Sequence, residues 1–201
     1  MTVIKKNDFI ASIANALQYI SYYHSEDFIL AMGRAFEIEK STEAKDAILQ
    51  ILTNSKLAAY GSRPICQDTG IVTVFIKQGM DLKWDSDKTI EEMVNQGVRN
   101  AYLDEINPLR ASIVQNPISD RINTKDNSPA VVHINLVPGD SLDISIAAKG
   151  AGSENKAVLG MLNPSDSIVD FILDEMPKMG AGWCPPGVLG VGIGGTADKA
   201  M

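Results

Sequence analysis

The sequence has few cysteines, few histidines and no long hydrophobic run. Its longest apolar runs are too short to cross a bilayer, so we do not expect a membrane protein. The opening residues lack the apolar region and cleavage site of a secretory signal, so we expect the protein to be cytoplasmic. The two histidines, His24 and His133, have no serine or cysteine beside them in a catalytic signature, which leaves a hydrolytic triad without support.

Basic residues are outnumbered by acidic ones. The chain has 18 lysines and arginines against 25 acidic residues, for a formal net charge of −7. Because nucleic acid binding asks for a basic face, this balance argues against a nucleic acid partner. With 45% hydrophobic and 21% charged residues, the composition is that of a folded chain with one sizeable domain or two small ones.

Helical periodicity fills the first part of the chain. Apolar residues recur at three- and four-residue spacing in three segments, at 9–20, 28–36 and 42–60. Ser25 suits the N-cap of the second segment, and Gly61 is the expected left-handed cap at the end of the third. We therefore expect residues 1–62 to form a helical lobe.

Runs of β-branched residues bounded by turn residues follow this lobe. Strands are predicted at 71–77, 131–137, 142–148 and 188–194. Pro138 and Gly139 suit a type II turn, so the second and third strands are predicted to form a hairpin. The predicted class is α+β, with a helical N-terminal lobe followed by a small mixed sheet of about four strands flanked by helices.

The remaining segments separate into helices and one long loop. Thr89 and Glu92 fit a capping box at the start of a helix that extends to Tyr102. Further helices are predicted at 155–162 and 165–179. Residues 106–129 contain prolines and asparagines without periodicity, which predicts a long loop, and long loops in compact domains are often functional.

The segment RPICQDTG, residues 63–70, is the first that carries chemistry. Cys66 directly precedes an amide, Gln67, and a carboxylate, Asp68, at a junction between a helix and a strand. A thiolate ligand, a hydrogen-bonding amide and a titratable carboxylate together suit a metal site that also handles a proton. The alternative is a buried, inert cysteine followed by polar turn residues.

The segment KGAGSENK, residues 149–156, has the outline of an anion site. Gly150 and Gly152 allow the backbone to approach a ligand, and Ser153, Asn155 and Lys156 supply donors near a helix N-terminus. The spacing of a Walker A loop is absent, so nucleotide binding does not follow. The alternative is a turn that needs glycine for its backbone conformation.

The third segment is GWCPPGVLGVGIGG, residues 182–195. Its end, GVGIGG at 190–195, formally matches GxGxxG. We reject a dinucleotide site, because no full strand precedes the motif and the acidic partner expected about 20 residues after it would fall beyond Met201. Upstream, Cys184 is followed by Pro185 and Pro186, which predicts an extended, rigid backbone at the cysteine. Such a presentation suits a metal ligand, and packing would also explain it. The wide separation of Cys184 from the other cysteine excludes a zinc ribbon and a CxxC pair.

Taken together, four motifs in this order resemble one enzyme family. They are RPICQDTG, NPLRAS at 107–112, KGAGSENK and CPPGVLGVGIGG at 184–195. This arrangement is similar to that of the class I, iron-sulfur-dependent fumarate hydratases and their tartrate dehydratase relatives, and the likeness begins at about residue 10. The NPLRAS and KGAGSENK motifs resemble those of the fumarases more closely than those of the tartrate dehydratases.

The resemblance implies a cofactor and a reaction. Family members hold a 4Fe-4S cluster by three cysteine thiolates and leave one iron open as a Lewis acid. Cys66 and Cys184 match two of these ligands, and the third is not in this chain. The implied reaction is the reversible hydration of fumarate to (S)-malate, a lyase reaction of the tricarboxylic acid cycle.

The resemblance also implies the substrate contacts. Gln67 and Asp68 match positions at the substrate, with Asp68 as the acid that helps hydroxide to leave. Arg110 matches a carboxylate clamp, for which its planar guanidinium is suited. The matching positions in KGAGSENK imply that four further residues line the dicarboxylate pocket, namely Gly150, Ser153, Asn155 and Lys156.

The chain departs from the family pattern at its C-terminal end. Residues 1–201 are expected to be the N-terminal catalytic domain, truncated before the third cysteine and the domain that supplies the general base. We expect the chain to be inactive alone, to need that C-terminal domain or a separate subunit, and to form a homodimer. Two alternatives remain: an L-tartrate dehydratase alpha-type subunit, or a non-catalytic fragment that needs a partner chain.

Overall fold

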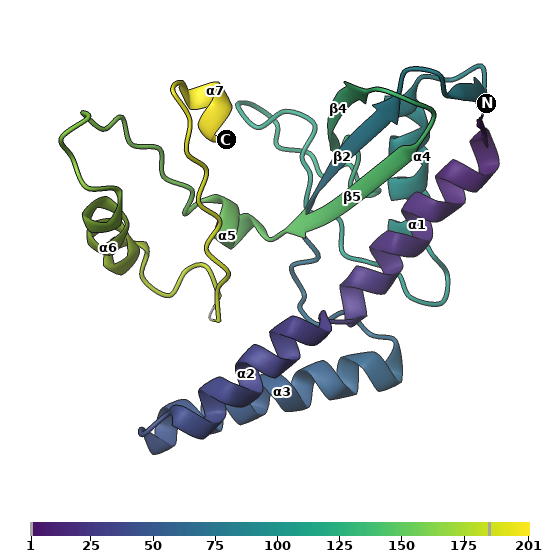
Figure 1. The fold of residues 1–201 in the computed structure, drawn as a ribbon. Helices are drawn as coiled ribbons and strands as arrows, with labels where there is room; N and C mark the ends of the chain where they lie inside the picture. The colour runs from purple at the N-terminus through teal and green to yellow at the C-terminus, as the bar shows by residue number, and fades with distance from the viewer. Residues whose placement is uncertain (1, 185) are drawn as a thin grey trace. The chain divides into compact units, whose positions relative to one another are not determined.

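A computed structural model describes residues 2–184 and 186–201. The chain divides into two compact units, Met1–Ala148 and Lys149–Met201. Helices and a small mixed sheet make up the fold (Figure 1), so the predicted α+β class is confirmed. Among the described residues, no helix is both long and apolar enough to span a membrane.

The described part of the first unit, residues 2–148, has four helices: α1 (Lys6–Tyr22), α2 (Glu26–Ile38), α3 (Thr42–Gly61) and α4 (Ile90–Tyr102). α2 and α3 pack against each other, whereas α1 packs mainly on α4. The prediction that Gly61 adopts the left-handed conformation is wrong by one residue. The helix includes Gly61, and Ser62 turns left-handed with φ 47° while the N–H of Arg63 reaches back to Ala58 O at 3.1 Å.

The main sheet has three strands, β2 (Ile71–Gly79), β4 (Val131–Val137) and β5 (Leu142–Lys149), in the order β4-β2-β5. β2 and β4 are parallel, and β5 runs in the opposite direction (Figure 1). The predicted hairpin is therefore wrong, because β2 lies between β4 and β5. Their connection passes over the end of β2, where the N–H of Gly79 donates to Ser141 O at 2.8 Å.

Two short strands form a second, parallel pair that the sequence pattern did not predict. β1 (Val3–Lys5) pairs with β3 (Lys83–Asp85). Each has only three residues, which is too short for a periodic signal.

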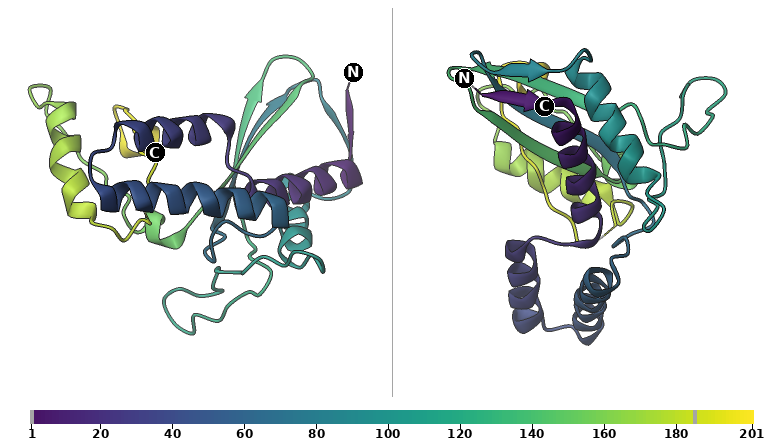
Figure 2. Two further views of the ribbon diagram at one scale, coloured as in Figure 1. Left: turned by 90° about the horizontal axis from the view of Figure 1, so that it is seen from below. Right: turned by 90° about the vertical axis from the view of Figure 1, so that its right-hand side faces the viewer.

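The core of the first unit lies on one side of the main sheet. Val72, Val74 and Ile76 of β2 are buried, whereas the alternate residues Phe75 and Lys77 are exposed. The buried residues form one cluster with apolar side chains of α1 and α4. Figure 2 shows α1 along this side of the sheet.

The capping box at the start of α4 is present as predicted. Thr89 Oγ1 accepts from the N–H of Glu92 at 3.2 Å, and a Glu92 side-chain oxygen accepts from the N–H of Thr89 at 2.8 Å. These contacts pair backbone donors that the helix itself leaves unpaired.

Thr89→Ala is expected to lower the free energy of unfolding by about 1 kcal/mol, because it removes one half of this box. Urea unfolding monitored by circular dichroism measures the change. Thr53→Ala is the matched control, since Thr53 is exposed in the interior of α3 and alanine is the better helix former. Equal losses in the two variants would contradict the assigned role of the box.

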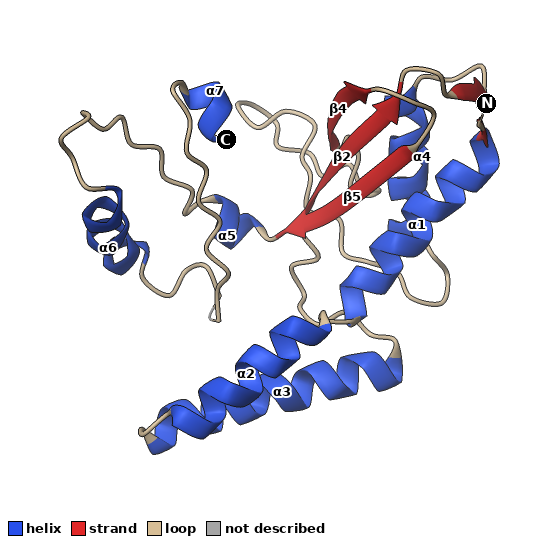
Figure 3. Cartoon of the chain, in the orientation of Figure 1, coloured by secondary structure: helices blue, strands red, loops and turns tan. Residues whose placement is uncertain are grey.

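Residues 106–129 form the predicted long loop, drawn in tan in Figure 3. An isolated antiparallel bridge joins Val114 to Asn123 inside it. The peptide bond between Ser128 and Pro129 is cis.

The described residues of the second unit form three helices, α5 (Ala151–Glu154), α6 (Ile168–Met179) and α7 (Ala197–Ala200). The predicted helix at 155–162 is wrong, because the chain turns at Asn155 and continues without regular structure. The helix predicted at 165–179 is present as α6, capped by Ser167. The strand predicted at 188–194 is also wrong; glycines interrupt it, and among the described residues no strand pairs with it.

Candidate active site

The segment that carries Cys66 connects α3 to β2 and is fixed at Ile65. The N–H of Ile65 donates to Ser21 O near the end of α1 at 2.8 Å. The carbonyl of Ile65 accepts from Asn54 Nδ2 of α3 at 2.9 Å. Two helices therefore hold the residue that immediately precedes the cysteine.

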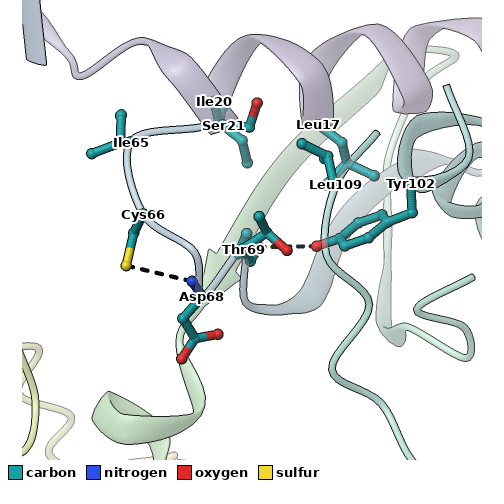
Figure 4. Close-up of a pocket in the computed structure, with 10 residues that line it drawn as sticks. Leu17, Ile20, Ser21, Ile65, Cys66, Asp68, Thr69, Tyr102 and Leu109 are labelled. Carbon is teal, nitrogen blue, oxygen red and sulfur yellow. Dashed lines mark hydrogen bonds between the residues drawn. The ribbon is translucent and has the colours of Figure 1, made fainter. Parts of the chain in front are cut away.

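The thiol of Cys66 is partly exposed and lies between its two polar neighbours. The N–H of Asp68 donates to Cys66 Sγ at 3.4 Å (Figure 4), and Gln67 Oε1 lies 3.4 Å from the same sulfur. A sulfur that accepts a backbone N–H can keep that contact when it binds a metal. The structure contradicts the burial that the alternative of a buried, inert cysteine requires.

Two hollows meet at Cys66 and Thr69. The inner one, drawn in Figure 4, has a volume of about 100 Å³ and is lined by Asp68 and by apolar side chains of α1. It is smaller than the hundreds of Å³ of an ordinary small-molecule site. The outer hollow is more open, and its lining includes Gln67 and Arg110. The outer hollow thus brings together predicted site residues from two of the motifs.

Tyr102 forms the back of the inner hollow. Its hydroxyl donates to Thr69 O at 2.9 Å and to Gly70 O at 3.2 Å. Burial raises the pKa of Tyr102, its hydrogen bond to Thr69 lowers it, and the charge of Asp68 raises it further. Tyr102 therefore remains a neutral donor at neutral pH. Its apolar spacing on α4 gave no sign of this role.

Arg110 comes from the start of the long loop, which is tied to the Cys66 segment. Thr69 Oγ1 donates to Arg110 O at 2.6 Å. On the other side, Asn107 Nδ2 donates to Gln18 Oε1 at 2.7 Å, and Gln18 Nε2 donates to Asn107 O at 3.0 Å. The backbone of Arg110 is thus held while its side chain stays exposed.

In the second unit, the KGAGSENK segment packs against the residues before Cys184. A Cβ on Gly152 would lie 2.6 Å from Gly182 O, so only glycine fits there. Ser153 Oγ donates to Trp183 O at 3.1 Å. A Cβ on Gly182 would meet Lys156 Cε at 3.0 Å. The KGAGSENK segment and the residues directly before Cys184 therefore lie side by side within this unit.

The other residues of the KGAGSENK segment surround the short helix α5. Gly150 is its N-cap, and Asn155 is its exposed C-cap. Lys149 Nζ pairs with a Glu154 carboxylate oxygen at 2.9 Å. Lys149 therefore has a charge partner within its own segment.

Cys184 is exposed and closes a turn. Its N–H donates to Ala181 O at 3.2 Å, and its φ is 59°. The predicted extended backbone at Cys184 is wrong, because the turn hydrogen bond holds the residue in the left-handed region. Pro185 lies outside the described residues.

One serine and one histidine do meet in the first unit. His24 Nδ1 lies 2.9 Å from Ser55 Oγ, and the His24 ring stacks on Phe28. Burial lowers the pKa of His24. Ser55 is only 6% exposed, so its hydroxyl is not placed to attack a substrate.

The donors fit an iron-sulfur cluster in kind but not in number. Both thiols are accessible, and thiolates are the ordinary ligands of such clusters. Within residues 2–184 and 186–201, no group of three or more histidine, cysteine, aspartate or glutamate side chains is placed to hold a metal ion. The described residues therefore do not complete a metal centre.

Comparison with known proteins places the chain in a family. The family described as Fumarate hydratase (Fumerase) matches residues 10–201. A Methanocaldococcus jannaschii protein, provisionally named L(+)-tartrate dehydratase subunit alpha, is 39% identical over 89% of this chain and 64% of its own length. The anaerobic class I fumarate hydratase of Escherichia coli is 33% identical, over 88% of this chain and 34% of its own.

A eukaryotic relative with a fumarate hydratase name is similar to about the same extent. Fumarate hydratase 2 of Leishmania major is 34% identical over 92% of this chain and 33% of its own length. The chain thus spans about a third of these fumarate hydratases and 64% of the archaeal protein. The motifs and these matches agree, and the chain belongs to the fumarate hydratase family.

Proposed function

We propose that this chain is the N-terminal part of a hydro-lyase that reversibly hydrates fumarate to (S)-malate. The observation that carries the proposal is the outer hollow. It is lined by a thiol, an amide and a guanidinium, from Cys66, Gln67 and Arg110, and two separate motifs supply them. Carboxylate recognition, hydrogen bonding and metal ligation are the functions that a dicarboxylate hydratase needs in one place.

Each residue of the first unit has a distinct task in this proposal. Arg110 binds one substrate carboxylate through its planar fork of N–H donors. Gln67 donates from its side-chain amide to a substrate oxygen. Asp68 transfers the proton of the oxygen that is added or removed. It accepts this proton from the attacking water in hydration and returns it to the departing hydroxide in dehydration.

The second unit contributes donors and a second thiol. Gly150, Ser153, Asn155 and Lys156 are proposed to bind the dicarboxylate, which the packing of their segment beside Trp183 supports. Cys66 and Cys184 would each supply one thiolate to a 4Fe-4S cluster. When bound, such a cluster supplies a Lewis acid to the substrate oxygens. The third thiolate and the base for the carbon-bound proton are proposed to come from outside this chain.

A second candidate is dehydration of L-tartrate. It is favoured by the archaeal relative, whose 39% identity exceeds the 33% of the Escherichia coli fumarate hydratase and whose name describes one subunit of an enzyme. In that case the missing parts would come from a separate chain. Homodimerisation and a cytoplasmic location belong to the proposal in either case.

Substrate comparison tests the proposal. The full-length protein, with any partner subunit, is reconstituted anaerobically with iron and sulfide and assayed with fumarate, mesaconate and L-tartrate. We expect kcat/KM for fumarate to exceed that for L-tartrate by about 100-fold, because L-tartrate carries one hydroxyl more than (S)-malate, the hydration product, and a pocket shaped for malate discriminates against an added hydroxyl by about this factor. The reverse order would establish the tartrate enzyme. No turnover of any of the three would contradict the hydro-lyase proposal and favour a non-catalytic fragment.

A further inference from the structure

A buried asparagine joins the long loop to the Cys66 segment. Asn127 is fully buried. Its Oδ1 accepts from the N–H of Ser112 at 2.7 Å and from the N–H of Ile113 at 3.3 Å. Its Nδ2 donates to Gly70 O at 3.0 Å. One side chain therefore bonds to both segments that supply the outer hollow.

The positions at the two ends of this link are close to the proposed substrate groups. Gly70 follows Asp68 by two residues, and Ser112 follows Arg110 by two residues. Thr69 makes the other direct tie, from its Oγ1 to Arg110 O at 2.6 Å. Because these two ties hold two short segments, they set the spacing between the backbones from which Gln67 and Arg110 extend.

The residue type at position 127 matches both of its tasks. Asn127 has a φ of 59°, a left-handed conformation that asparagine tolerates better than most residues. Its amide also presents an acceptor to one segment and a donor to the other. An aspartate would keep the acceptor and the backbone preference but would face Gly70 O with a second acceptor.

We propose that Asn127 is a positioning residue that sets the length of dicarboxylate accepted between Gln67 and Arg110. This inference rests on the proposed function. Asn127 acts through the spacing of the two segments and does not touch the substrate. A fixed spacing favours a four-carbon dicarboxylate over three- and five-carbon ones, because only one length satisfies both ends.

The test removes the hydrogen bond from Asn127 to Gly70 and keeps the hydrogen bonds that Asn127 accepts from the loop. Asn127→Asp loses the donor to Gly70 O and keeps the acceptor for the loop. Asn123→Asp is the matched control: its Oδ1 accepts from the N–H of Lys125 at 2.7 Å, and its Nδ2 donates to Ala111 O at 2.8 Å, so its bonds stay within the loop. Inhibition constants of malonate, succinate and glutarate are measured for the reconstituted full-length protein and both variants.

We expect the preference for succinate over malonate and glutarate to fall by about threefold to tenfold in Asn127→Asp, the factor that one hydrogen bond supplies. Asn123→Asp should keep the preference of the unmodified protein. In the metal-free protein, the rate at which iodoacetamide alkylates Cys66, read by peptide mass spectrometry, should change in Asn127→Asp only. This second readout does not depend on activity.

The outcomes separate the two proposals. Equal weakening of all three inhibitors in Asn127→Asp, with an unchanged succinate preference, would overturn the positioning role and leave the proposed function in place. An unmodified protein that binds none of the three dicarboxylates would overturn the proposed function, and this inference with it.

Discussion

Cys66→Ser is expected to remove the iron-sulfur absorbance and the hydratase activity that we propose for the reconstituted full-length protein. Serine keeps the size of the side chain but replaces a soft thiolate by a hydroxyl that iron-sulfur clusters do not ordinarily use. Changes to groups that merely support a metal ligand already cost about 10- to 100-fold. Loss of the ligand itself should therefore lower kcat/KM by at least about 100-fold.

Visible absorbance, iron content and fumarate turnover measure this loss. Urea unfolding of the metal-free variant is the control, because Cys66 is only partly buried and the substitution should leave the free energy of unfolding nearly unchanged. Cys184→Ser should give the same loss of absorbance. A Cys66→Ser protein that keeps its cluster and its turnover would show that the ligands lie elsewhere.

Gly79→Ala is expected to lower the free energy of unfolding by about 3 kcal/mol. A Cβ at Gly79 would collide with Gly139 O, and would lie 2.7 Å from Gly139 C and 2.8 Å from Asp140 Cα. These atoms are backbone, so no side-chain rotation relieves the overlap. The connection between β4 and β5 would have to lift away from the end of β2.

Gly33→Ala is the matched control for this prediction. Gly33 lies in α2, and nothing lies within 4 Å of the position of an added Cβ. Alanine in a helix is favoured over glycine, so this variant should gain about 0.5–1 kcal/mol. Urea unfolding of both variants gives the two values. A Gly79→Ala protein as stable as the unmodified one would mean that the connection does not cross β2.

The candidate site was only partly predictable from the sequence. The residue types at Cys66, Gln67 and Asp68 predicted a chemistry, because a thiol, an amide and a carboxylate are adjacent. Tyr102 and Asn127 gave no such signal. Tyr102 matched the apolar face of a helix, and Asn127 was one polar residue of an aperiodic loop. Their roles depend on carbonyl groups of Thr69 and Gly70, far away in the sequence, and no local pattern reports such a contact.

The sequence by itself determined the local structure of several segments that carry their own signal, although the strand predicted at 188–194 and the helix predicted at 155–162 did not form. The capping box at Thr89 is present, and the β-branched run at 131–137 is β4. Only the tertiary structure decided how these elements combine. The Pro138-Gly139 turn was compatible with a hairpin, yet β2 takes the place between the two strands. Burial of Val72, Val74 and Ile76 under α1 and α4 favours that order, and this burial is a property of the assembled sheet.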